Sequence, residues 1–179
     1  MGIEIRKASV KDAPFLAQMM LQSSRAGKKS GLFDLIFESD DDKKILKCLE
    51  ALTQTVAKNH CHYENFLIAQ LDGQSVGTLC SYEPRIATKQ AFEDALKEVG
   101  CSEDLEESLE VLYQCDFKLN TRTLMFDFME ELEGFVDVGV LKSLMQKSLL
   151  SARLKGYRIA QAIVEIGSLE TLLFYKKLG

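Results

Sequence analysis

A chain of 179 residues, of which 46% are hydrophobic, is long enough for one domain with an ordinary core. The formal net charge of −5, without a pronounced lysine and arginine cluster, argues against a nucleic-acid partner. No run approaches the roughly 18 apolar residues of a membrane-spanning helix, and the charged N-terminus does not fit a signal peptide. We therefore expect a single domain over residues 1–179, in the cytoplasm, with no nucleic-acid or membrane partner.

The cysteines favour a reducing compartment. The chain has five of them, an odd number, and no Cys-x-x-Cys pair. We therefore expect neither a disulfide framework nor a zinc site. His60 and His62 flank Cys61, but no third ligand is indicated, so we predict no metal site and a loop or strand start at this position.

The first half of the chain predicts short strands and amphipathic helices. A strand is expected at 3–6, followed by a helix with Asp12 as its cap and Pro14 in its first turn. Residues 24–30 are polar and predict a loop. Apolar residues then recur every three or four positions over 40–58, including Val56, which predicts a second helix. Strands at 66–71 and 75–82 flank Asp72-Gly73, a strong hairpin signal.

The next part of the chain is predominantly helical in pattern. A helix is predicted over 88–99, and Ser102 suits the cap of an acidic helix over 103–110. The pattern at 111–119 leaves helix and strand open.

The second half predicts strand, helix, strand and helix. Residues 123–129 alternate as a strand does, which would put Phe126, Phe128 and Glu130 on one face and Asp127 and Glu131 on the other. A clear amphipathic helix is expected over 140–155, ended by Gly156. Its inward residues would be Leu141, Leu144, Met145, Leu149 and Ala152. Residues 159–166 predict a buried strand, and residues 168–179 a short helix.

Three segments resemble motifs of the GCN5-related N-acetyltransferases (GNAT). The closing segment Ser168 to Gly179 is similar to that family's Asn-x-x-Ala-x-x-apolar-Tyr-x-Lys-Leu-Gly, with Tyr175 in the tyrosine position and Ser168 and Thr171 departing. The opening Ile-Arg-Lys-Ala-Ser-x-x-Asp-Ala and the hairpin from Leu67 to Gly77 resemble the family's first strand and second hairpin. The resemblance covers nearly the whole chain apart from an insert at about 83–120.

The resemblance implies an α/β fold, with a GNAT-like mixed central sheet flanked by helices. A helical insert would lie between the third and fourth strands. Family members usually continue with further strands beyond the position of Gly179, so these C-terminal strands are expected to be absent or truncated.

The resemblance also implies acetyl-CoA as cosubstrate. In the family a turn of the form Arg/Gln-x-x-Gly-x-Gly/Ala binds the pyrophosphate through backbone amides at a helix N-terminus. Gly139 fits this pattern, whereas Val136 and Leu141 depart from it, and Leu141 could instead turn inward with the helix stripe. The implied cofactor-binding residues are Met129, Val136, Asp137, Val138, Gly139, Val140, Leu141, Lys142 and Ser168.

By the same resemblance, Tyr175 would protonate the departing CoA thiolate. For the base that deprotonates the amine we prefer Glu130 to Glu131, although both could be solvated residues of an acidic loop. The acceptor would be an amine-bearing small molecule or peptide, and a homodimer is a further expectation. The alternative is a catalytically inactive GNAT-fold module for binding or regulation, with the insert as its interaction surface.

Overall fold

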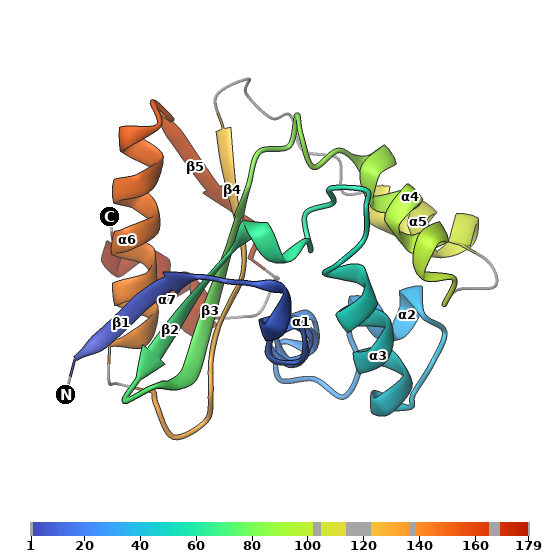
Figure 1. Cartoon of the computed structure of the whole chain (residues 1–179), viewed down its shortest axis with the longest axis horizontal. Coiled ribbons are helices and arrows are strands. Elements are labelled where there is room, and N and C mark those ends of the chain that lie inside the picture. Colours follow the sequence, from blue (N-terminus) through green and yellow to red (C-terminus); the bar gives the residue numbers. More distant parts are fainter. Residues whose placement is uncertain (1, 102–104, 114–122, 137–138, 165–168, 179) are drawn as a thin grey trace.

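The computed structural model describes residues 2–101, 105–113, 123–136, 139–164 and 169–178. Its centre is a five-stranded sheet in the order β1-β2-β3-β4-β5 with helices on both faces (Figure 1). The strands are β1 (Ile3–Lys7), β2 (Phe66–Leu71), β3 (Gln74–Tyr82), β4 (Thr123–Glu131) and β5 (Ile159–Ala162). Neighbouring strands are antiparallel except β4 and β5, which are parallel. The expected α/β class with a mixed sheet is confirmed.

Two helices cover one face of the sheet, and the remaining helices lie on the other side (Figure 1). The first group is α6 (Val140–Leu154) and α7 (Leu169–Leu178); the second is α1 (Ala13–Arg25), α2 (Leu32–Ile36), α3 (Asp42–Leu52), α4 (Lys89–Val99) and α5 (Leu105–Tyr113). Short 3-10 turns occur at η1 (Val10–Asp12) and η2 (Tyr63–Asn65). Within the described residues, none of the helices has the length and apolar character needed to cross a bilayer.

The expected start of α1 is present, but Asp12 acts differently from a helix cap. Its carboxylate accepts hydrogen bonds from the Ser9 backbone N–H at 2.7 Å and from Arg6 at 2.7 Å and 2.9 Å. The Arg6 guanidinium holds the pKa of Asp12 low, at about 2. Asp12 therefore fastens the entry of α1 to β1, and Pro14 lies in the first helical turn as expected.

The second helix is shorter than expected, because α3 ends at Leu52 and not at residue 58. The buried side chain of Asn59 donates to the Leu52 carbonyl at 3.1 Å and to the Thr55 hydroxyl at 2.9 Å, and accepts the Cys61 N–H at 2.7 Å. These bonds satisfy the helix end and turn the chain toward β2. Val56, expected on the apolar face, is 86% exposed. The hairpin was predicted correctly, with Asp72 and Gly73 both at positive φ (50° and 83°) as its two-residue turn requires.

The insert between β3 and β4 contributes α4 and α5, which pack on the same side as α3. Thr88 caps α4 by accepting the Ala91 N–H at 3.1 Å. The acidic helix continues through Tyr113, whereas the proposed cap Ser102 and most of the ambiguous segment 111–119 lie outside the described residues.

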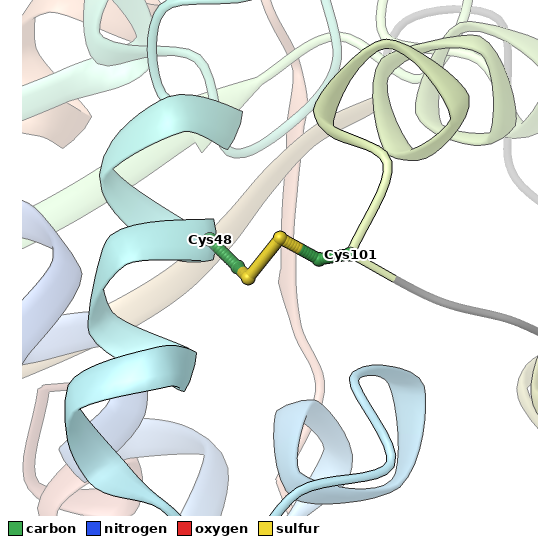
Figure 2. The surroundings of a disulfide bond; sticks show 2 residues. All are labelled: Cys48 and Cys101. Atoms are coloured by element: carbon green, nitrogen blue, oxygen red, sulfur yellow. A yellow bond between two sulfur atoms is a disulfide. The ribbon is translucent and has the colours of Figure 1, made fainter.

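A disulfide joins the insert to the rest of the fold, contrary to our expectation. Cys48 on α3 and Cys101, just after α4, are bonded, with their Cα atoms 6.2 Å apart (Figure 2). Spacing in the sequence could not indicate this pair, because the docking of α4 on α3 brings the two residues together across 53 positions. Cys61 and Cys80 are free and buried.

Two apolar clusters fill the two sides of the sheet. The larger lies among α1, α2, α3 and the insert, and the smaller lies beneath α6. Gly77 of β3 allows α6 to approach closely, because a Cβ there would lie 2.6 Å from Val140 Cγ1 and 2.9 Å from the Glu130 carbonyl oxygen. The start of α6 is therefore seated directly on the sheet.

Two expectations for the C-terminal part were wrong. Leu149 is 42% exposed, and Ser148 takes its place on the buried stripe of α6. The β5 strand is short and exposed rather than buried, with Ile159 at 40% exposure. Among the described residues it pairs only with β4, so it forms an edge of the sheet. An apolar run in the sequence does not distinguish an edge strand from a central one.

Candidate functional site

A β-bulge interrupts β4 in the middle of the sheet. Cys80 of β3 pairs with Asp127, and Thr78 pairs with Glu130, so that β4 has one extra residue between these pairs. Phe128 takes up the irregularity with a φ of +44°, and its carbonyl accepts the Thr78 hydroxyl at 3.1 Å. Positive φ is costly for an aromatic residue, so the surrounding packing must hold this conformation in place.

The bulge changes which side chains share a face. Phe126 packs in the cluster beneath α6, whereas Phe128 packs on the α1 and α3 side. Asp127 also lies toward that side, since it interacts electrostatically with Cys61 and Cys80. The predicted grouping of Phe126 with Phe128, opposite Asp127, was therefore wrong, because strict alternation holds only for an unbulged strand.

Immediately after this point the sheet opens between β4 and β5. The parallel pairing ends at Phe126 and Ala162, so β4 has no β5 partner over Asp127–Glu131. Among the described residues, no strand pairs with this side of β4 beyond Phe126, so its backbone groups there have no strand partner.

Two carboxylates lie along the opened part of β4. The mostly buried Asp127 accepts its neighbour Phe128's N–H at 2.8 Å, and burial raises the pKa of Asp127 to about 6. Glu130 accepts a hydrogen bond from Gln22 Nε2 of α1 at 2.9 Å, and burial raises its pKa too. Each carboxylate thus has a greater affinity for a proton than it has in water.

Tyr175 approaches the same place from α7. Its side chain is half-buried against the cluster beneath α6. Burial raises its pKa to about 12, and the negative charges of Asp127 and Glu130 add to the effect. The structure thus brings Tyr175 within electrostatic range of both carboxylates, and its hydroxyl keeps its proton at neutral pH.

The turn before α6 forms the third part of the site. Gly139 is the residue before the helix, with a φ of +88°, and as glycine it has no side chain to cap the first backbone amides of α6, nor is a side-chain cap formed among the described residues. Val140 is buried and Leu141 packs inward against the cluster beneath α6, as the alternative reading of Leu141 held. Such an uncapped helix N-terminus attracts anions.

The remaining predicted cofactor residues are distributed as follows. Lys142 is exposed on the first turn of α6, Val136 is 60% exposed in the preceding loop, and Met129 packs against the cluster beneath α6. Asp137, Val138 and Ser168 lie outside the described residues. Within the described residues, no three His, Cys, Asp or Glu side chains are arranged to hold a metal ion.

Sequence reasoning missed Asp127 and Gln22. Alternation placed Asp127 away from Glu130, and only the bulge brings it to the carboxylate side of β4. Gln22 lies 108 positions from Glu130, and nothing in its sequence surroundings indicated this contact. A short motif could have revealed neither residue.

Comparison with known proteins identifies the fold. No family model matches the sequence, and no curated protein sequence matches it. Among solved structures, an N-acetyltransferase from Staphylococcus aureus Mu50 superposes with a TM-score of 0.71 at 17% identity, over 98% of this chain and 89% of that one. A PaiA N-acetyltransferase from Thermoplasma acidophilum in complex with coenzyme A superposes with a TM-score of 0.57 at 18% sequence identity. The match covers 100% of this chain and 89% of that one.

A third similar structure names the family of this fold. It is a GNAT family acetyltransferase from Brucella melitensis in complex with acetyl-CoA, with a TM-score of 0.52 at 17% identity, over 99% of this chain and 82% of that one. The chain therefore has the fold of the GNAT acetyltransferases. At these identities the likeness defines the fold and not the activity.

Proposed function

We propose that this protein is an acyl-CoA-dependent N-acetyltransferase, which moves an acetyl group from acetyl-CoA to an amine of a small molecule or peptide. The observation that carries the proposal is the opening between β4 and β5, with Tyr175 at its side and the uncapped start of α6 beyond it. Solved proteins of the same fold hold acetyl-CoA or coenzyme A, which supports the same cosubstrate here.

Acetyl-CoA would bind with its pyrophosphate at the N-terminus of α6. Gly139 suits this turn, because its φ of +88° is a conformation that residues with a side chain rarely adopt. Lys142 would add a positive charge at the mouth of the site. The pantetheine chain would follow the unpaired edge of β4, whose backbone groups can hydrogen-bond to an amide-containing chain.

The acceptor amine would attack the thioester carbonyl, and the oxyanion that forms would accept a hydrogen bond from a backbone N–H of β4. Tyr175 would give its proton to the departing thiolate, as its protonated state at neutral pH permits. Glu130 would take the proton of the acceptor ammonium through water. Asp127 is the alternative base, since its carboxylate lies on the same side and, within the described part of the chain, accepts a hydrogen bond only from the Phe128 N–H.

Titration calorimetry with acetyl-CoA and with free CoA tests the binding step. We expect micromolar affinity for acetyl-CoA, and a loss of at least tenfold when Gly139 is replaced by valine, because a branched side chain at positive φ deforms the turn. Gly134→Val is a matched control at another positive-φ glycine. No binding at millimolar acetyl-CoA, with the protein folded, would exclude the transferase.

The catalytic step requires a panel of amines with detection of free CoA. Acetylation of at least one amine class, with turnover lost in Tyr175→Phe, is the expected result. Binding of acetyl-CoA without turnover of any amine would favour the inactive module. Two observations support this second candidate. Leu141 turns inward where the family pattern has a small residue, and the exposed Val136 stands where that pattern has arginine or glutamine.

A further inference from the structure

A second pocket lies at the end of α6 remote from the Gly139 turn. It has a volume of about 310 Å³, which suits a small ligand. Four residues line it at the spacing of one helix face: Ser148, Ser151, Ala152 and Lys155. Along the helix axis the Gly139 turn lies about 14 Å from Ser148 and about 24 Å from Lys155. The pocket is thus separate from the opening between β4 and β5.

Ser148, one of the residues that line this pocket, has a buried hydroxyl without a hydrogen-bond partner among the described residues. Ser148 is 3% exposed, and its Oγ makes no hydrogen bond to the part of the chain that the structure describes. Ser143 on the same helix shows the usual arrangement, in which the hydroxyl donates to the carbonyl four residues earlier, here Gly139 at 2.9 Å. A buried hydroxyl without a hydrogen-bond partner lowers the stability of the folded protein. A ligand that accepts a hydrogen bond from Ser148 would remove this cost and bind more tightly.

The charges that remain free in the pocket are positive. Two carboxylates line it, and both are occupied: Glu64 by Lys58 at 2.7 Å, and Glu83 by Arg85 and by the Tyr157 hydroxyl at 2.6 Å. Lys7 and Lys155 also line the pocket, and neither forms an ion pair with a described carboxylate. Leu67 and Leu124 supply an apolar wall.

We propose that this pocket, here called the α6 pocket, binds a small organic anion. A carboxylate or phosphate group would lie between Lys7 and Lys155 and accept a hydrogen bond from Ser148. The apolar body of the ligand would rest against Leu67 and Leu124. Such a ligand is distinct from the proposed acetyl-CoA and amine, so the inference stands independently of the proposed function.

Titration of isotopically labelled protein with benzoate, followed by amide chemical shifts, tests the proposal. We expect saturable shifts at the amides of Ser148, Ser151 and Lys155, and binding at least tenfold weaker for the neutral isostere benzamide. Phenyl phosphate in place of benzoate distinguishes a preference for phosphate from one for carboxylate. Equal affinity for benzoate and benzamide, or shifts scattered over the surface, would overturn the proposal.

Two variants separate a binding role from a structural one. The double substitution Lys7→Gln and Lys155→Gln should weaken benzoate binding at least tenfold. The control double substitution Lys11→Gln and Lys147→Gln should leave it unchanged, since both control lysines are exposed and lie outside the pocket. Ser148→Ala should weaken benzoate binding several-fold without lowering the melting temperature, because the hydroxyl has no partner to lose among the described residues. Unchanged benzoate affinity in both pocket variants would refute the assignment.

Discussion

The carboxylate of Asp127 is mostly buried at the bulge and accepts one hydrogen bond from the described residues. Its negative charge therefore lowers the stability of the folded protein by a measurable amount. Its pKa is raised from 3.8 to about 6 in the folded protein. The folded state therefore holds this proton more tightly than the unfolded chain does. The associated stability is complete below about pH 4 and is lost as the pH rises through about 6.

Asp127→Asn should therefore be more stable than the parent protein at pH 7, by on the order of 2–3 kcal/mol. The amide removes the buried charge and its oxygen can still accept the Phe128 N–H. Denaturant unfolding at pH 4 and pH 7 measures the difference, which should nearly vanish at the lower pH. An equal effect at both pH values would contradict the buried-charge explanation.

The same substitution distinguishes the two candidate bases. If Glu130 takes the acceptor proton as proposed, Glu130→Gln should lower kcat by a factor on the order of 10² and Asp127→Asn should leave the rate largely intact. The reverse pattern would transfer the role to Asp127. In the parent protein kcat should rise with pH through the raised pKa of the base.

Tyr175→Phe should lower kcat by a factor on the order of 10² with little change in the dissociation constant of acetyl-CoA. The substitution removes only the hydroxyl, whose pKa of about 12 makes it a proton donor at neutral pH. Phe174→Leu on the same helix is a suitable comparison. A parallel loss of binding and rate in Tyr175→Phe would indicate a packing role.

At Gly77 the sheet and α6 are in close contact. In Gly77→Ala the new methyl group would lie too close to Val140 and to the Glu130 carbonyl. We expect a loss of about 1–3 kcal/mol from overpacking, together with weaker acetyl-CoA binding because the first turn of α6 must move. Thermal unfolding and calorimetry measure the two effects. Gly2→Ala, where nothing lies within 4 Å, should change neither.

Elements with a strong local pattern were predicted correctly. The hairpin at Asp72-Gly73 and the helix from Thr88 depend on turn and cap chemistry within a few residues, so the sequence indicates them directly. The end of α3, by contrast, depends on the Asn59 side chain folding back over seven residues. The bulge in β4 depends on Thr78 in another strand. Long-range causes of this kind leave no periodic signal.

The site was predicted less completely than the fold. Tyr175 and Glu130 emerged from a family-like motif and from a position at the end of a strand, and the structure brings them into electrostatic range of each other. The pairing of Cys48 with Cys101 was missed because only tertiary packing joins them.

At the scale of the whole molecule, the disulfide ties the insert to α3. The loop-closure model predicts a contribution of about 4 kcal/mol for a separation of 53 residues. Reductant should therefore lower the melting temperature of the parent protein, whereas Cys101→Ser should begin at the lower value and not respond. A melting temperature that reductant leaves unchanged would show that the bond does not form or adds nothing.

The helix α6 runs unbroken from the Gly139 turn to the stripe of the α6 pocket. Two ligands at its opposite ends would act on one stiff body that rests on the sheet at Gly77. Thermodynamic linkage then requires reciprocity: whatever factor an anion in the α6 pocket applies to the affinity for acetyl-CoA, acetyl-CoA must apply to the affinity for that anion. Through this one helix, the concentration of the anion would determine how much of the protein holds acetyl-CoA.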